Sequence, residues 1–404
     1  MKRNRRVVIT GAGTINPIGA SVRATMQSMA SGTCGIGPLD LPDIGRLRIK
    51  IGAQVKGYAP HENFSDAALL QLDRAVQFTL IAAHEAIAQS GIVFSKDLAS
   101  NTGVILGTAG GGLETQEANY RAVFQDGRNR VHPLVVPKLM HNAGAAQVSM
   151  EWGLTGPSYS VSSACASSNH AMGQAFHLIR SGALEAAVTG GADAMLTFGG
   201  VKAWEGLRVL SPDGCRPFCA DRNGMVLGEG AAVFVFETLE HARARGATPL
   251  AEVVGFAMTS DAFDLVSPSQ DGAANAMQRA LADGNVRAAQ VDYINAHGTG
   301  TVANDRTESA AIHDVFEKHA AQLLVSSTKS MHGHLIGGTG AVELIAVLLA
   351  LTDGVVAPTI GGAPDTCLGL DVVAKVARAA HPEVAMSNAF AFGGANAVLV
   401  LRRA

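Results

Sequence analysis

Short runs of β-branched and aliphatic residues alternate with longer stretches rich in alanine and leucine, and this alternation constrains the fold most. The short runs are predicted strands at 6–10, 103–106, 186–189, 232–236, 291–295, 324–327, 385–387 and 397–401. The longer stretches are predicted helices at 74–89, 166–180, 273–282, 308–318 and 341–351. Strands that alternate with helices are typical of a sheet with crossover helices, so the sequence predicts an α/β fold.

The length of the chain indicates two halves rather than one core. At 404 residues it exceeds what a single hydrophobic core usually organises, and its 48% apolar and 16% charged residues exclude a disordered chain. No linker rich in proline or serine divides it. A turn at 241–249 precedes a new predicted strand at 250–255, so we expect two tightly packed halves, 1–249 and 250–404.

The charge balance argues against a nucleic-acid partner. The chain has 31 lysines and arginines against 34 aspartates and glutamates, which gives a net charge of −3. A chain without an overall basic field does not attract a polyanion at long range. We therefore expect no nucleic acid among its partners.

The sequence favours a cytoplasmic protein without a membrane span. The basic residues 1–6 precede only three apolar residues before Thr10, too few for an export signal. The apolar stretch 341–351 contains Glu343 and is shorter than the roughly 18 residues of a span, so we expect a buried helix there. We interpret the five cysteines as reduced thiols: Cys34, Cys165, Cys215, Cys219 and Cys367.

The segment VVITGAG at 7–13 is similar to the start of a dinucleotide-binding fingerprint. The third glycine of that fingerprint is replaced by Asn16, and no acidic residue follows at the distance needed to hold a ribose. We therefore expect a strand and a tight turn at this place, without a nucleotide.

Cys165 lies in SSACASSNHAMG, where a predicted strand runs into a predicted helix. The positive end of a helix dipole and unpaired N–H groups favour a thiolate, so the sequence predicts a lowered thiol pKa. Small neighbours leave the sulfur accessible. The alternative for any single cysteine is a buried and inert thiol.

Two segments of the second half place histidines at strand ends. In NAHGTGT, His297 opens a loop with Thr299 and Thr301, whose hydroxyls can bind a polar arm of a ligand. In SSTKSMHGHLIGGTGA, Lys329 and His334 precede an apolar helix. The second segment lacks the residue order of a phosphate loop. His332 and His334 could ligate zinc, but no nearby cysteine or acidic residue completes the set, so we expect no metal.

The closing segment SNAFAFGGANA places two aromatic residues beside a glycine pair. Phe390 and Phe392 next to Gly393 can act as a mobile lid. A plain hairpin with both rings in the core is the alternative.

In this order, these segments resemble the β-ketoacyl-[acyl-carrier-protein] synthases, in the elongating branch of the thiolase-like condensing enzymes. The matching stretches cover nearly the whole chain and also include RRVVITGAGTINPIG and CRPFCADRNGMVLGEGA. Within the family, residues 202–218 and the ANDRTE that follows the histidine loop are most similar to nodulation-type ketosynthases, which build specialised unsaturated acyl chains.

The resemblance implies a five-layer αβαβα fold of two related halves, with the nucleophile in the first half and both histidines in the second. It also implies a Claisen condensation in fatty acid or specialised acyl biosynthesis. Cys165 takes an acyl group from acyl-carrier protein. Malonyl-carrier protein then loses CO2, and its carbanion attacks the thioester to give a 3-oxoacyl chain two carbons longer.

Catalytic and supporting roles follow from the same resemblance. His297 and His334 would stabilise the enolate as neutral N–H donors. Lys329 would support the site electrostatically and pair with Glu308. Backbone N–H groups of Cys165 and Phe392 would bind the acyl carbonyl oxygen.

Binding roles follow as well. Phe392 and Gly393 would gate malonyl access, while Thr299 and Thr301 would bind the phosphopantetheine arm. Phe390 and Gly110 would line the acyl pocket. Because elongating relatives often carry a bulkier aliphatic residue at the position of Gly110, we expect a deeper pocket.

Differences from related classes of thiolase-like protein argue against several other functions. Thiolases carry a second catalytic cysteine in the closing segment, but Cys367 lies outside it. Starter-condensing enzymes use Cys-His-Asn, whereas His334 makes this set Cys-His-His. A chain-length factor lacks the nucleophile that Cys165 provides. Ala391 replaces the first glycine of the usual gating motif, which removes some backbone freedom.

Three alternatives stay open: the ketosynthase subunit of a polyketide heterodimer with a chain-length factor, a silent carrier-binding protein, and a cysteine hydrolase. We expect a homodimer or such a heterodimer, with no cofactor bound by the enzyme itself, since the 4′-phosphopantetheine arrives on acyl-carrier protein. The carrier is acidic, so a local basic patch is expected among Arg121, Arg128, Arg130, Lys138, Lys202 and Arg208.

Overall fold

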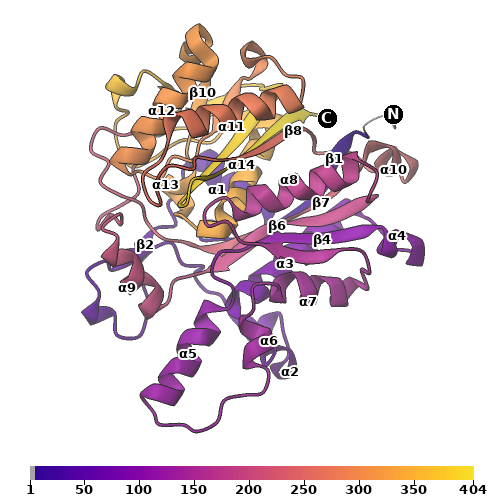
Figure 1. Cartoon of the computed structure of the whole chain (residues 1–404), viewed down its shortest axis with the longest axis vertical. Helices are drawn as coiled ribbons and strands as arrows, with labels where there is room; N and C mark the ends of the chain where they lie inside the picture. The colour runs from indigo at the N-terminus through magenta and orange to yellow at the C-terminus, as the bar shows by residue number, and fades with distance from the viewer. Residues whose placement is uncertain (1–4) are drawn as a thin grey trace.

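The fold is built on one eleven-stranded sheet, seen in a computed structural model that describes residues 5–404 (Figure 1). Residues 1–4, where the basic N-terminal run begins, lie outside the described residues. The strand order is β12 (Asp371–Val372), β10 (Leu324–Ser326), β9 (Tyr293–Asn295), β14 (Val384–Ala391), β15 (Ala395–Arg403), β8 (Ala251–Ser260), β1 (Val7–Ile15), β7 (Glu229–Thr238), β6 (Ala186–Ala194), β4 (Thr102–Gly107) and β5 (Ser158–Val161).

The two halves of this sheet share one topology. The first half has the order β5-β4-β6-β7-β1, and the second has β10-β9-β14-β15-β8. In each half the first two pairings are parallel and the last two are antiparallel. The halves join where Val7–Ile9 of β1 pairs with Ala251–Val253 of β8. The expected pair of related halves is therefore confirmed.

Helices complete five layers around the half-sheets (Figure 1). Helices α3 (Arg74–Ser90) and α7 (Ala143–Trp152) cover the outer face of the first half, while α11 (Gln270–Asp283) and α12 (Val302–Phe316) lie outside the second. Between them, α8 (Ser167–Arg180) and α14 (Thr339–Asp353) contact strands of both halves and each other. This arrangement confirms the αβαβα fold. A boundary at residues 249/250 stays a prediction, and α10 (Leu239–Ala244) ends just before it.

The remaining elements are short and lie mostly at the periphery. They are helices α1 (Val22–Ser31), α2 (Asp66–Leu69), α4 (Lys96–Ser100), α5 (Leu113–Phe124), α6 (Val135–Leu139), α9 (Phe198–Gly206) and α13 (Lys329–His332), and the strand pairs β2 (Gly37–Pro38) with β3 (Ile51–Gly52) and β11 (Val355–Val356) with β13 (Arg378–Ala379). Helices α5 and α6 form an arm that projects from the first half (Figure 1).

The predicted elements are present, with shifted ends. Helix α3 ends at Gly91 in the left-handed conformation, as its sequence indicates. Helix α12 begins at Val302, six residues earlier than expected, because Thr301 caps it by accepting a hydrogen bond from the N–H of Asn304.

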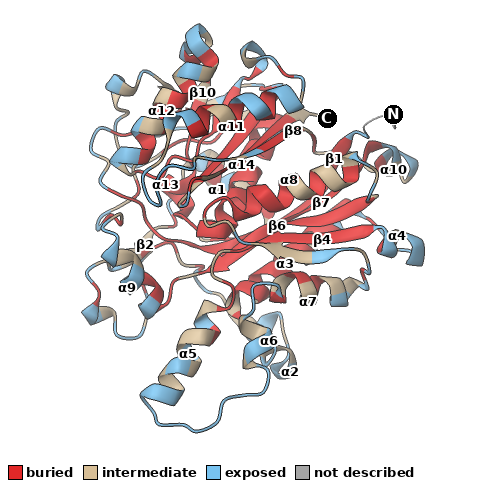
Figure 2. Cartoon of the chain, viewed as in Figure 1, coloured by how far each residue is buried: buried red, intermediate tan, exposed pale blue. Residues whose placement is uncertain are grey.

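Helix α14 is the centre of the core. With the turn before it, Ile336–Asp353 is an 18-residue segment of mean hydropathy 1.6, long and apolar enough to cross a membrane, but 89% of it is buried inside the protein. Figure 2 shows this buried centre beneath half-exposed outer helices. The expected buried helix is confirmed, and it is longer than expected.

Strand β1 runs through the glycines of the dinucleotide-like segment, so the tight turn expected after Thr10 is wrong. The strand continues to Ile15 with an irregularity between Ile9 and Gly11. The glycines are needed for packing, because a Cβ at Gly13 would lie 2.0 Å from the carbonyl oxygen of Ala82 in α3.

Gly13→Ala should therefore lower the free energy of unfolding by roughly 1–3 kcal/mol, since β1 and α3 must move apart. Urea unfolding checks this loss. Gly45→Ala is the matched control, because its Cβ would meet nothing within 4 Å. Equal stability of the two variants would contradict this account of the glycine segment.

Candidate active site

Cys165 lies on a strained turn between β5 and α8. The preceding residue, Ala164, has a φ of 48°, which is rare for a residue with a side chain. The hydroxyl of Ser167, the first residue of α8, accepts a hydrogen bond from the N–H of Ser163 and so ties the turn to the helix. The turn places the sulfur in a cavity lined by residues of both halves.

The predicted lowering of the thiol pKa by the helix dipole is wrong for the resting protein. Burial raises the pKa of the Cys165 thiol to about 12, although the Lys329 charge and the N–H groups of Phe392 and Cys165 oppose the rise. The side chain is only 6% exposed, so loss of solvation outweighs the dipole. The thiol is therefore protonated at rest.

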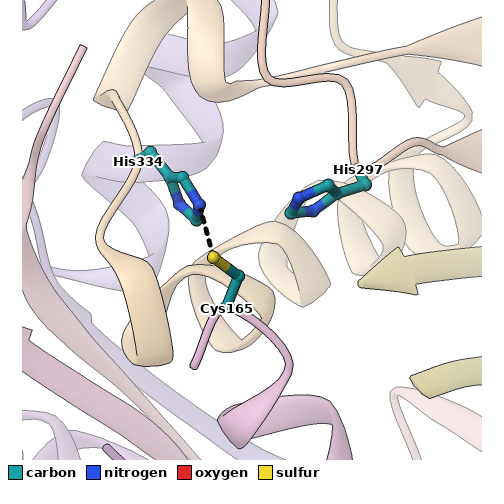
Figure 3. A group of neighbouring side chains, drawn as sticks. All are labelled: Cys165, His297 and His334. Carbon is teal, nitrogen blue, oxygen red and sulfur yellow. Dashed lines mark hydrogen bonds between the residues drawn. The ribbon is translucent and has the colours of Figure 1, made fainter. Parts of the chain in front are cut away.

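Both histidines point at the sulfur (Figure 3). The Nε2 atom of His334 lies 3.1 Å from Cys165 Sγ. The rings of His297 and His334 are nearly perpendicular, with centroids 5.6 Å apart. The sulfur and one ring nitrogen of each histidine all lie within 4.8 Å of one another.

The partners of the other ring nitrogens determine where each imidazole holds its proton. The Nδ1 atom of His334 has two partners: the Thr339 hydroxyl lies 2.8 Å away, and the N–H of Ile336, which can only donate, donates to it over 3.2 Å. The ammonium of Lys329 faces Nδ1 of His297 at 3.5 Å. Since both Nδ1 atoms accept, both Nε2 atoms carry the proton. The space beside the sulfur therefore faces two N–H donors.

Burial and the Lys329 charge also keep both rings neutral. They lower the pKa of His297 and of His334 well below the usual value. A neutral ring with its proton on Nε2 can donate a hydrogen bond to developing negative charge without first releasing a proton.

The expected ion pair between Lys329 and Glu308 is wrong. Lys329 is fully buried, and its Nζ lies 2.5 Å from Oε1 of Glu343 and also donates to the carbonyl oxygen of His297. Glu343 lies in α14, one turn into the helix. A buried ammonium needs a carboxylate partner, and Glu343, an acid within the apolar stretch 341–351, was the signal for it in the sequence.

Glu308 instead holds the histidine loop. Its carboxylate accepts hydrogen bonds from the backbone N–H groups of His297 and Gly298, both at 2.8 Å, and from the amide of Asn388. Because Glu308 belongs to α12, these bonds fix the end of β9 against that helix. Glu308 therefore positions the backbone of His297.

Polar and aromatic side chains line the way to the sulfur. The hydroxyls of Thr299 and Thr301 lie 2.9 Å apart on the cavity wall. Phe390 is buried with its ring edge toward His297, and both phenylalanines of the closing segment line the cavity. The sequence did not point to Trp204 of α9, which stacks on Phe392 at 5.9 Å.

The closing segment is a hairpin whose turn lies at the cavity. Strands β14 and β15 pair antiparallel through Ala391 and Ala395, so the hairpin of the alternative interpretation is present. Phe390 is buried as that interpretation expects, but Phe392 is only half-buried and lines the cavity. Gly393 has a φ of 80° and donates its N–H to the carbonyl oxygen of Leu265. Nothing lies within 4 Å of the position of a Cβ at Gly393, so the turn is open on that side.

Gly110 does not line the cavity at the sulfur. A Cβ there would lie 3.1 Å from Cγ and 3.3 Å from Sδ of Met195, which packs against the cluster around Cys165. The cavity holds about 200 Å³, less than the roughly 300 Å³ and more of most ligand sites. A long chain therefore needs more space than this cavity offers.

The sulfur and the two imidazoles have the number and type of ligands that zinc prefers. A ligating nitrogen must be free of its proton, however, and the donors at both Nδ1 atoms keep the protons on Nε2. The donor set therefore does not fit zinc.

The free energy of unfolding should fall as the pH drops below about 6.5. There the unfolded chain protonates its histidines, whereas the pKa of His297 and of His334 stays well below 6.5 in the fold. Unfolding then takes up protons, so the free energy of unfolding falls by up to about 1.4 kcal/mol per pH unit for each histidine.

Urea unfolding of the wild type and of His297→Leu between about pH 5 and 7.5 measures this slope, which should be shallower in the variant. Parallel curves would show that His297 also protonates in the fold. His84, which is exposed, provides the matched control as His84→Leu.

Family models match both halves of the chain. "Beta-ketoacyl synthase, N-terminal domain" matches residues 4–242, and "Beta-ketoacyl synthase, C-terminal domain" matches residues 250–363. Together they cover well over half of the sequence and confirm the resemblance derived from the motifs.

Individual relatives match along the whole chain. Nodulation protein E of Rhizobium sp. (strain N33) is 46% identical over 99% of this chain and 100% of its own. The 3-oxoacyl-[acyl-carrier-protein] synthase 2 of Staphylococcus aureus (strain COL) is 37% identical over 100% of this chain and 99% of its own.

A solved structure agrees with this placement. The ishigamide ketosynthase/chain length factor superposes with a TM-score of 0.94 at 34% identity, covering 99% of this chain and 100% of that one. The shared fold, the cysteine between two histidine donors and the full-length matches lead to one conclusion: the chain belongs to the β-ketoacyl synthase family and is a condensing acyltransferase.

Proposed function

We propose that the protein elongates acyl chains as a 3-oxoacyl-[acyl-carrier-protein] synthase in fatty acid or specialised acyl biosynthesis. One observation carries the proposal: two neutral imidazoles direct Nε2–H donors at the space beside the Cys165 sulfur. A hydrolase would need a base at the sulfur rather than two donors. A silent binding protein would need neither.

In the first step, Cys165 accepts the acyl group and the carrier leaves as a thiol that takes the cysteine proton. The backbone N–H groups of Cys165 and Phe392, which already face the sulfur, bind the negative acyl oxygen. The Lys329 charge favours the thiolate needed for this attack.

In the second step, the malonyl group loses CO2 and its thioester oxygen becomes an enolate oxygen. His297 and His334 donate to that oxygen, and Lys329 holds the ring of His297 in place. The carbanion then attacks the acyl carbonyl carbon, and the Cys165 sulfur leaves. The product stays on the carrier as a 3-oxoacyl thioester.

The carrier brings its own prosthetic group. Thr299 and Thr301 are placed on the cavity wall to bind the amide groups of a phosphopantetheine arm. Phe392 and Gly393 form the gate at the closing turn. No cofactor of the enzyme enters either step.

We further propose that the protein works as a dimer in the cytoplasm, either with itself or with a chain-length factor. Strand β5 is an edge of the sheet, and a free edge can pair with another chain. Large apolar side chains are exposed on the neighbouring arm, namely Tyr120, Phe124, Val136 and Met140. A ketosynthase of a polyketide heterodimer is the alternative, supported by the likeness to the ishigamide structure.

The basic residues expected in the carrier-binding patch differ in whether a carboxylate of the chain already pairs with them. Arg121 is paired with Asp43 and Glu117, and Lys202 is paired with Glu205. Arg208 directly precedes Val209, a residue of the cavity wall. We propose that Arg208 contributes most to carrier docking.

Intact-protein mass spectrometry with acyl-carrier thioesters, followed by malonyl-carrier protein, tests the proposed function. The wild type should gain the acyl mass and release it as a 3-oxo product. Cys165→Ala should gain no mass, whereas Cys215→Ala, which removes another buried thiol, should load normally.

His297→Leu should still load but release product roughly 10²–10³-fold more slowly, because one enolate donor is gone. Absence of an adduct on the wild type, tested alone and with a chain-length factor, would contradict condensation. Release of the acyl group as free acid would indicate hydrolysis.

Gly110→Ile should shift the preferred donor to shorter acyl chains, because the new side chain presses on Met195. Gly110→Ala should produce a smaller shift in the same direction. Competition among acyl-carrier thioesters of graded length measures both. Unchanged chain-length selectivity in Gly110→Ile would show that Gly110 does not line the acyl pocket.

A further inference from the structure

Asp193 is a buried carboxylate that accepts an unusual number of hydrogen bonds from two separate loops. It lies near the end of β6 and is fully buried. The hydroxyl of Thr108 donates to it at 2.7 Å, and the N–H groups of Ala109 and Gly110 donate at 3.0 and 2.9 Å. The N–H of Gly337 donates to it at 2.7 Å.

These bonds join the segment of Gly110 to the turn that follows His334. The turn is the short helix η5 (Ile336–Gly338). The two loops approach so closely that a Cβ at Gly337 would lie 2.5 Å from the backbone nitrogen of Ala109. The hydroxyl of Ser168 in α8 donates to the carbonyl oxygen of Gly337. Gly337 is therefore held through both its N–H and its C=O.

The turn held in this way is strained. Ile336 has a φ of 51°, in the left-handed region that a β-branched residue rarely adopts. Such a conformation persists only where the surroundings fix it. In this conformation the N–H of Ile336 donates to Nδ1 of His334, which the Thr339 hydroxyl also contacts at 2.8 Å. Because an N–H group can only donate, its bond keeps the proton of that ring on Nε2.

We propose that Asp193 is a positioning residue for decarboxylation, which holds the strained turn at Ile336 and thereby keeps His334 as an Nε2–H donor beside Cys165. The chain of contacts runs from the carboxylate through Gly337 and Ile336 to the ring. Asp193 touches no substrate. Its second set of bonds, to residues 108–110, links the orientation of His334 to the floor predicted for the acyl pocket.

The inference rests on the proposed function, because a fixed donor at His334 matters most when an enolate forms. It predicts that displacing His334 slows the two half-reactions by different factors. Acyl transfer to Cys165 uses backbone N–H groups and needs His334 little. Decarboxylation uses the His334 donor directly, and small displacements of such a group cost up to about 10²-fold in rate.

Asp193→Asn tests the inference with almost no change of shape. One carboxylate oxygen becomes an NH2 group, which faces the N–H donors of one of the two loops. We expect kcat for malonyl-carrier decarboxylation to fall about 10- to 100-fold, with KM within about threefold of the wild type. Acyl loading should not slow, because the Asp193 charge raises the pKa of the Cys165 thiol and its loss favours the thiolate.

Glu237→Gln is the matched control. Glu237 is also a fully buried carboxylate with several partners, and it lies on β7 opposite Ala186, at the other end of the strand that carries Asp193. The Glu237→Gln variant should be less stable than the wild type but keep the wild-type ratio of the decarboxylation rate to the acyl-loading rate. Thr108→Val removes a single donor to Asp193 and should lower the same ratio about two- to fivefold.

Thr108→Val decides the question if Asp193→Asn does not fold. An unchanged ratio in the folded variants, or equal losses in both half-reactions, would overturn the positioning role. A wild type that loads but does not decarboxylate malonyl-carrier protein would instead overturn the proposed function. In that case, NMR of ¹⁵N-labelled histidine still tests the positioning role of Asp193. His334 should lose its pure Nε2–H form in the Asp193 or Thr108 variant. An unchanged His334 signal would overturn the inference.

Discussion

The buried ammonium of Lys329 is the charge on which the electrostatics of the site depend. Removing such a group from water costs several kcal/mol, so it persists only with a close partner, here Glu343 of the central helix. The pair holds the carbonyl and the ring of His297 and helps to keep both imidazoles neutral. The same charge favours the thiolate of Cys165 against the effect of burial.

The repeated topology explains why these groups meet. Cys165 follows β5, the third strand of the first half in chain order, and Lys329 and His334 follow β10, the third strand of the second. Each segment leads into one of the two central helices, α8 and α14, which contact each other. Packing the halves together therefore places two equivalent turns face to face. Neither half contains a complete site.

Regular elements and site motifs could be predicted from the sequence because their signals are local. The alternation of runs identified the strands and major helices, and glycine at position 91 marked the end of α3. The roles of Cys165, His297 and His334 came from a resemblance along the whole chain and stay a proposal. The partner of Lys329 and the thiol pKa were predicted wrongly, because both depend on burial and on residues far apart in the chain.

The sequence by itself determined the α/β class from periodicity and the family from motifs in order, and the resemblance to that family implied the two related halves. Only the tertiary structure decided that Glu343 rather than Glu308 pairs with Lys329, that the resting thiol is protonated, and that Asp193 reaches two loops. The reason is physical: ion pairing, desolvation and tautomer choice are set by distance and exclusion of water, and folding establishes both.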